Sequence, residues 1–273
     1  MRILLRSVIA LTALLVAATF GTVRAADMPI KAPSMPAPPP VWSWTGFYIG
    51  GNAGYAWGTA NLDPSFTCAI FGLCPINDAA NLANSNAIAG GSLSPSGFTG
   101  GGQLGYNWQT GNWVLGVETD FDALNLRDSR SASVPRTTLA SIFSATTSIS
   151  TGWMYTLRGR LGWTVAPTVL LYASGGLALA DATLSNAFAI TGLGATAGAS
   201  STSPTLTGWT VGGGLEWMVA QNWTVKAEYL YVDFGSISTT ANVVGGGAAV
   251  PNVYSTSTDL KTNIVRAGVN YKF

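Results

Sequence analysis

Charged residues are scarce in this sequence, and histidine is missing altogether. Only 9% of the 273 residues are charged, against about 25% in an ordinary soluble domain. With 13 basic and 12 acidic residues and no cluster of Lys or Arg, the chain lacks the positive surface that nucleic-acid binding requires. The absence of His removes the commonest general base and metal ligand, so the composition argues against an enzyme.

Long apolar runs are also lacking beyond the N-terminus. No stretch there reaches the roughly 18 apolar residues that a membrane-spanning helix needs, although hydrophobic residues make up 48% of the chain. A chain this apolar and this poor in charge is typical of membrane proteins built from strands of alternating residues.

The N-terminus has the three parts of a secretory signal peptide. Arg2 and Arg6 precede an apolar stretch over residues 7–20, and Ala25 and Ala26 offer small residues for cleavage. We predict a signal peptide over residues 1–25 and a Pro-rich periplasmic linker over residues 26–43. The prolines of this linker cannot donate the backbone hydrogen bonds of a sheet. The mature chain is therefore expected to work outside the cytoplasm.

Cysteine is nearly absent, since Cys68 and Cys74 are the only two. Export to an oxidising compartment favours a small disulfide loop between them. A redox motif would need closer spacing, so we expect a structural role.

Between Trp44 and Phe273, eight segments alternate with a period of two residues. One face of each segment is free of charge, and the opposite faces carry the strand charges: Glu118, Asp120, Arg158, Arg160, Glu216, Lys226, Glu228, Arg266 and Lys272. Alternation alone fits either a soluble barrel with charges outside or a membrane barrel with charges inside.

Two features favour the membrane barrel. Long and short connections alternate strictly along the chain, as in an up-and-down barrel with external loops and periplasmic turns. Aromatic residues also flank the segments at both ends, which predicts two girdles at the membrane interfaces. Trp108, Trp113, Trp163, Trp217 and Trp223 lie near the short turns, and Trp57, Trp153 and Trp209 lie near the long connections.

A third feature is the C-terminus. Gly268, Tyr271 and the final Phe273 resemble the assembly signal in the last strand of outer-membrane barrels. A last strand in lipid must pair its backbone with the first, so the barrel must close.

We therefore predict an all-β fold over residues 44–273. It is a transmembrane up-and-down antiparallel β-barrel of eight strands in the cell outer membrane, with long external loops and short periplasmic turns. The intervals 58–97, 127–150, 182–205 and 235–258 are rich in Ser, Thr, Ala, Asn and Gly. We expect them to be exposed loops with almost no core.

Two segments resemble a known family. Trp44-Thr-Gly-Phe47-Tyr-Ile-Gly-Gly-Asn52-Ala-Gly-Tyr55 and Val269-Asn-Tyr-Lys-Phe273 are similar to the small porin-family, opacity-like surface antigens of Gram-negative bacteria. The resemblance implies an eight-stranded barrel, surface exposure, and a role in envelope integrity or host contact. It supplies no catalytic, cofactor or metal residues.

The interior of an eight-stranded barrel is just wide enough to be filled by side chains. We expect Glu118, Asp120, Glu216 and Glu228 to pair there with Arg158, Arg160, Lys226 and Arg266, because buried charges need partners. The first hypothesis is thus a structural surface protein with a filled lumen. The alternative is a narrow porin for small solutes, in which the same charges stay hydrated.

The sequence bears on two further functions. An enzyme acting on outer-membrane lipids would lack the usual activating base, since the chain has no His. Adhesion through the loops is compatible with the first hypothesis. The expected partners are outer-membrane lipid, the barrel-insertion machinery, and host or cell-wall components, with no nucleic acid and no cofactor.

Overall fold

The computed structural model describes residues 42–68, 83, 86–135, 142–191, 196–245 and 248–273. Among them, no helix has the length and hydropathy needed to cross a membrane. The predicted signal peptide, most of the predicted linker, and Cys74 with its predicted disulfide lie outside the described residues. The strands are β1 (Gly46–Cys68), β2 (Gly91–Leu93), β3 (Ser96–Thr110), β4 (Trp113–Leu124), β5 (Arg127–Pro135), β6 (Ile142–Ala166), β7 (Val169–Thr191), β8 (Thr196–Thr202), β9 (Thr205–Ala220), β10 (Trp223–Gly245) and β11 (Ala248–Lys272).

Eight of these strands form a closed antiparallel ring in the order β1, β3, β4, β6, β7, β9, β10, β11. β1 pairs with β3 along one edge and with β11 along the other, so the first and last strands close the ring. Closure pairs the backbone of every ring strand on both sides, as a bilayer requires. The prediction of an eight-stranded up-and-down barrel is therefore confirmed.

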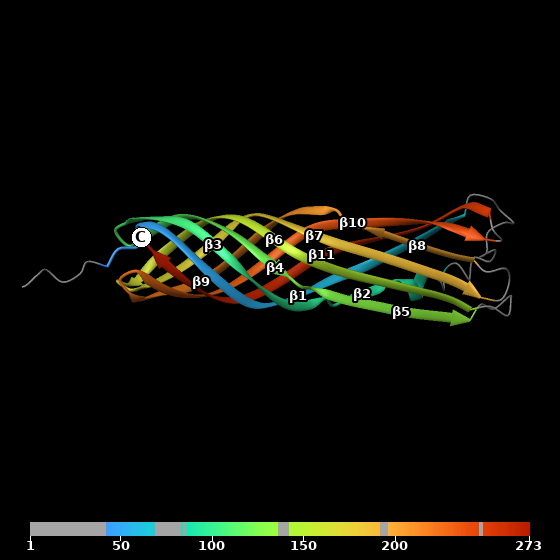
Figure 1. Ribbon diagram of the computed structural model, residues 1–273, viewed down its shortest axis with the longest axis horizontal. Coiled ribbons are helices and arrows are strands. Elements are labelled where there is room, and N and C mark those ends of the chain that lie inside the picture. Colours follow the sequence, from blue (N-terminus) through green and yellow to red (C-terminus); the bar gives the residue numbers. More distant parts are fainter. Residues whose placement is uncertain (1–41, 69–82, 84–85, 136–141, 192–195, 246–247) are drawn as a thin grey trace, which may run out of the picture. The chain divides into compact units, whose positions relative to one another are not determined.

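The two ends of the barrel differ in their connections. At one end, here called the turn end, residues 111–112, 167–168 and 221–222 join neighbouring strands. Gly111 has a φ of +61°, which suits a tight hairpin turn. The C-terminus lies at this end, whereas β5 and β8 lie toward the opposite end, here called the far end (Figure 1).

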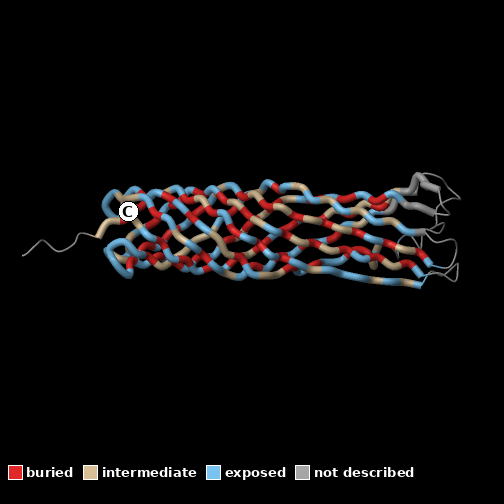
Figure 2. The backbone as a smooth tube through the Cα atoms, in the orientation of Figure 1, coloured by how far each residue is buried: buried red, intermediate tan, exposed pale blue. Residues whose placement is uncertain are grey.

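Burial alternates along each strand of the ring (Figure 2). Toward the turn end, the uncharged face points outward, and Leu115 and Leu161 are about half exposed there, at 52% and 49%. The charged residues of the same strands point inward. The barrel is thus apolar outside and polar inside over this part, the arrangement of a membrane-spanning barrel.

Toward the far end, the polarity is reversed. Ala180, Ala182 and Leu184 of β7 are completely buried, while Thr183 and Ser185, which alternate with them, point outward. The buried residues belong to a large apolar cluster inside the barrel, which also contains Leu124, Met154, Phe234, Leu260 and other residues. The outward hydroxyls pair across strands, as Ser185 does with Ser201 at 2.9 Å. This is the arrangement of a barrel surrounded by water.

The expectation of long loops with almost no core was therefore wrong for much of these intervals. β1 continues to Cys68 and β7 continues to Thr191. β10 runs as far as Gly245, and β11 already begins at Ala248. β2, β5 and β8 add further strands within three of the intervals. Small apolar residues alternate there with Ser and Thr, so the composition resembles that of loops while the side chains still form a core.

Replacing Leu184 with Ala tests whether this far-end core stabilises the protein. Deleting a completely buried Leu side chain leaves a cavity, so we expect a loss of about 2–5 kcal/mol of unfolding free energy. The matched change Thr183→Ala, one residue away and facing outward, should cost less than about 0.5 kcal/mol. Urea unfolding of the refolded barrel in detergent micelles measures both, and equal effects would contradict a packed core.

Candidate functional site

The charged side chains inside the barrel come from five strands, β4 and β6 on one side of β7 and β9, β10 and β11 on the other. Strand register places Glu118 opposite Arg158, Glu216 opposite Lys226, and Glu228 opposite Arg266. Each residue lies at an inward position of its strand, so alternation alone directs all of them into one space. All eight residues of the predicted lumen network lie within this cluster.

Arg158 lies at the centre of the cluster and contacts three carboxylates. Its guanidinium is 2.5 Å from Glu118, 2.7 Å from Asp120 and 2.7 Å from Glu228. One nitrogen also donates a hydrogen bond to the Ser174 hydroxyl at 3.1 Å. Three acids therefore share this one cation.

Arg266 joins three of the acids from the opposite side. It lies 2.9 Å from Asp120 and 2.8 Å from both Asp122 and Glu228. Asp122 was not among the predicted residues, although it follows Asp120 at the next inward position of β4. The two-residue period was therefore a sufficient signal to find it.

Arg160 and Lys226 complete the network toward the turn end. Arg160 lies 2.6 Å from Glu216, and the Lys226 ammonium lies 2.9 Å from Glu118. The Tyr48 hydroxyl donates a hydrogen bond to Glu118 at 2.7 Å. Tyr48 was also missed by sequence reasoning, although it occupies an inward position between the outward Phe47 and Ile49.

The paired side chains are almost completely shielded from solvent. None of the ion-paired side chains is more than 2% exposed. Charges buried this deeply are tolerated only when they are paired and hydrogen-bonded, and removing one partner leaves an uncompensated charge. The network therefore fills the cross-section of the barrel with groups that depend on one another.

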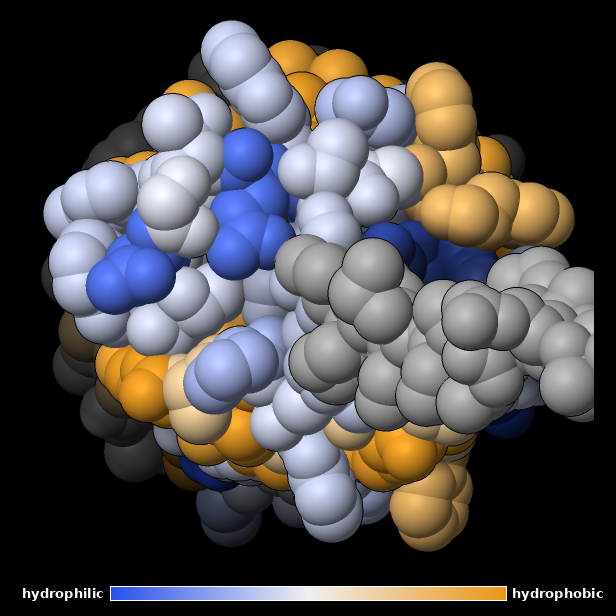
Figure 3. Space-filling view, turned by 90° about the vertical axis from the view of Figure 1, so that its left-hand side faces the viewer, coloured by the Kyte–Doolittle hydropathy of each residue, from blue (hydrophilic) through white to orange (hydrophobic). Residues whose placement is uncertain are grey.

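An apolar layer closes the interior on the turn-end side of the charges. Trp44, only 1% exposed, packs with Val114, Leu170, Tyr172 and Met218. Val114 precedes Glu118 on β4, and Met218 follows Glu216 on β9, so this layer lies nearer the turn end than the network. Seen from that end, hydrophobic side chains gather mainly at the periphery, outside the part covered by grey atoms (Figure 3).

Trp44 is held in place through its backbone. Its amide donates to the Gln109 side-chain carbonyl at 2.8 Å, and the Gln109 amide donates to the Thr45 hydroxyl at 2.9 Å. The Lys272 ammonium donates to the carbonyl oxygens of Ser43 and Thr45 at 2.6 and 3.2 Å. Trp44 and Thr45, the first residues of the predicted barrel range 44–273, are thus anchored to β3 and β11.

The predicted girdle residues lie on the outside of the barrel. Trp108, Trp113, Trp163, Trp217 and Trp223 surround the turn end with 41–62% of their surface exposed. Farther along the strands, Trp57 and Trp209 are 41% and 50% exposed, and Trp153 is half-buried. Trp113 and Trp163 contact each other edge to face at 4.7 Å.

The residues of the predicted assembly signal lie at the closing edge. Gly268 and Tyr271 belong to β11, and the Phe273 amide donates to the carbonyl of Phe47 at 2.9 Å. Phe273 itself is 72% exposed on the outside. Recognition of these residues by the insertion machinery stays a prediction.

The acidic side chains of the described ranges were predicted to have structural rather than catalytic roles. Within these ranges, no group of three or more His, Cys, Asp or Glu side chains is arranged to hold a metal ion. Glu118 and Asp120, the pair of carboxylates two residues apart, are both engaged by Arg158. Both carboxylates are thus engaged within the ion-pair network.

Comparison with known proteins places this geometry in context. A family model described as "Outer membrane protein beta-barrel domain" matches residues 13–273. The 31 kDa outer-membrane immunogenic protein of Brucella melitensis is 37% identical over 264 residues, which cover 94% of this chain and 97% of that protein. The 22 kDa outer membrane protein of Rhizobium leguminosarum is 30% identical over 197 residues, covering 72% and 67%. Neisserial surface protein A aligns with a TM-score of 0.39 at 14% identity, covering 84% and 98%.

Replacing Arg158 with Leu should destabilise the barrel strongly. The change leaves Glu118, Asp120 and Glu228 without their shared cation, and breaking a buried pair costs about 3–5 kcal/mol. The exposed Lys261→Gln should cost little by comparison. The temperature at which the folded, fast-migrating gel band disappears compares the two variants. An unchanged temperature for Arg158→Leu would contradict the network.

Replacing Trp44 with Ala tests the apolar layer. Removal of a buried Trp should lower the unfolding free energy by about 3–5 kcal/mol. Trp42, which packs only partly buried against the same cluster, serves as the control, and Trp42→Ala should have less than half the effect. Denaturant unfolding followed by gel mobility measures both. If the two variants lose the same stability, Trp44 has no special place in the barrel.

Proposed function

Because the chain belongs to the outer membrane protein β-barrel family, we propose that it is a structural surface barrel whose lumen is closed by its own side chains. Its far end faces the outside of the cell, and its turn end faces the periplasm. In this role it contributes to envelope integrity or to contact with host and other surfaces.

The continuous filling of the interior carries this proposal. From the turn end outward, the Trp44 layer, the charged network and the large apolar cluster follow one another along the axis. A hydrated pore would need polar groups in contact with water, whereas the paired side chains here are at most 2% exposed. Five buried acids and four buried bases pair with one another across the lumen.

The far end supports a role in surface display. Its reversed polarity lets the described strands continue beyond the bilayer as a packed barrel. Relatives from Brucella carry the name outer-membrane immunogenic protein, which fits a protein that antibodies reach. We propose outer-membrane lipid, the insertion machinery, and host or cell-wall components as partners.

Single-channel recording in a planar bilayer tests the closed lumen. The purified barrel should insert without producing a reproducible open step, because the charged network and both apolar layers block the axis. A larger porin recorded in the same bilayer shows that an opening would be detected. Steady open steps would instead support the alternative, a narrow porin for passive diffusion of small solutes.

A further inference from the structure

The buried ion-pair network holds one acid more than its bases can balance. Its acids are Glu118, Asp120, Asp122, Glu216 and Glu228, and its bases are Arg158, Arg160, Lys226 and Arg266. None of these residues is more than 4% exposed. Five carboxylates against four cations leave one negative charge without a counter-charge, and an uncompensated charge is costly inside a protein. The interior therefore requires one more positive charge, either a proton or a cation.

Asp122 is the acid that is compensated least. Among the described residues, Asp122 and Glu216 each contact a single cation, whereas the other three acids contact two or more. Glu216 also accepts hydrogen bonds from Thr224 and Asn270 at 2.6 and 2.9 Å. Asp122 accepts one beyond its ion pair, from Asn52 at 3.0 Å. Of the acids, Asp122 thus has the greatest need of a further positive charge.

A chain of amides fixes the orientation of Asn52 beside Asp122. A carboxylate only accepts hydrogen bonds, so Glu216 orients Asn270, whose amide nitrogen donates to it at 2.9 Å. The Asn270 oxygen accepts from the Gln103 nitrogen at 2.5 Å, and the Gln103 oxygen accepts from the Asn52 nitrogen at 3.3 Å. The same Asn52 nitrogen donates to Asp122 at 3.0 Å. Both N–H bonds of this amide are therefore used, and its oxygen points away from these partners.

Two buried oxygen atoms near Asp122 have no hydrogen-bond partner within the described chain. They are Oδ1 of Asn52 and Oγ1 of Thr99, which belong to residues only 8% and 5% exposed. Strand register places Asn52 and Asp122 on either side of Gly101, and Thr99 occupies the next inward position of β3. Gly101 has no side chain, and a Cβ there would lie 2.5 Å from Oδ1 of Asp122. A carboxylate, an amide oxygen and a hydroxyl thus lie together on the inner wall.

A proton on Asp122 does not fit the hydrogen bonds around it. Its Oδ1 accepts from Asn52 at 3.0 Å and its Oδ2 accepts from Arg266 at 2.8 Å, so an O–H on either oxygen would face a donor. Reversing the Asn52 amide would remove the donor to Gln103. A proton would also leave Oγ1 of Thr99 without a partner. A cation meets these requirements better than a proton does.

We propose that Asp122, Asn52 and Thr99 bind a monovalent metal cation of the sodium class inside the barrel. Carboxylate, amide and hydroxyl oxygens are hard ligands, the kind that alkali and alkaline-earth cations prefer in proteins. A single positive charge makes the interior neutral, whereas a divalent ion would replace a surplus negative charge with a surplus positive one. The bound cation also gives the oxygens of Asn52 and Thr99 a partner.

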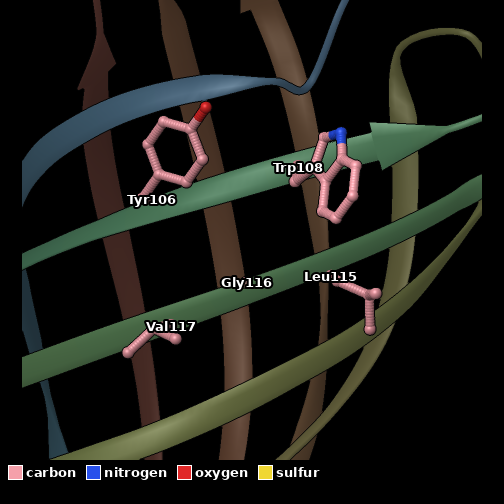
Figure 4. A pocket seen from close by; sticks show the side chains of 5 residues that line it. All are labelled: Tyr106, Trp108, Leu115, Gly116 and Val117. Carbon is pink, nitrogen blue, oxygen red and sulfur yellow. The ribbon is translucent and has the colours of Figure 1, made fainter.

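A hollow on the outer face shows the contrast with this interior site. It has a volume of about 490 Å³ and lies between Tyr106 and Trp108 of β3 and Leu115 and Val117 of β4 (Figure 4). These side chains carry no charge and face lipid, so a cation there would lose its water without gaining a charged ligand. The proposed site is therefore separate from the surface that meets the membrane.

The test compares the stability of the mature barrel in sodium and in choline. The refolded barrel is unfolded with urea in detergent micelles at one total salt concentration, while sodium chloride replaces choline chloride. Choline is too large to bind among the buried oxygens. Thr99→Val and Asp122→Asn each remove one ligand. Their matched controls are Thr256→Val, which removes another buried hydroxyl without a partner in the described chain, and Asp259→Asn, which removes an exposed acid of β11.

Sodium should stabilise the unaltered barrel, because a cation that binds only the folded state shifts the equilibrium toward it. We expect the unfolding equilibrium constant to fall at least about tenfold when sodium replaces choline. Both controls should keep this response, whereas Thr99→Val and Asp122→Asn should respond by less than about twofold. In choline, Asp122→Asn should be at least as stable as the unaltered barrel, because its acids and bases are then equal in number.

An unaltered barrel that is equally stable in sodium and choline would overturn the proposal, and this comparison needs no substitution. An equal sodium response in Thr99→Val and Thr256→Val would also overturn it, since the cation would then lie elsewhere. Neither result bears on the closed lumen, which the single-channel recording tests separately.

Discussion

The rest of the structure depends on the pairing of the first strand with the last. Lipid offers no hydrogen bonds, so every backbone group of the membrane-spanning strands must find its partner within the sheet. β1 meets this requirement by pairing with β3 on one side and with β11 on the other. A ring of eight strands then fixes the interior to a width that side chains fill, and inward-facing charges must find one another. The ion-pair network is therefore a consequence of closure.

The same strands continue without interruption from the lipid bilayer into the water outside it. On β7, Leu177 faces lipid at 59% exposure, whereas Leu184, seven residues farther, is completely buried inside the barrel. Inward and outward positions keep alternating between these two residues. What changes is the face that carries the apolar residues, which is the outer face at Leu177 and the inner face at Leu184. The position of the reversal identifies where the bilayer ends, and the exposed charges lie close to it.

Period-two alternation and the segregation of charge were enough to predict the ring and the inward placement of the charged residues. They could not reveal which acid meets which base, because that depends on register and on strands distant in sequence, as for Arg158 and Glu228. The far-end strands resemble loops in sequence because their inward residues are often Ala or Thr, which contrast weakly with outward Ser and Thr. The burial of Trp44 had no local signal, since Gln109 and Lys272 position it from far along the chain.

The contact between Lys272 and Ser43 spans 229 residues of the sequence. Contacts of such high order form late, because the chain must first give up the entropy of a very long loop. Synthesis and export proceed from the N-terminus, so one edge of β1 stays unpaired until β11, the final strand, has been exported. During that interval the edges of the sheet are open to pairing with other chains. A barrel closed in this way therefore depends, during its passage to the membrane, on protection of its unfinished edges.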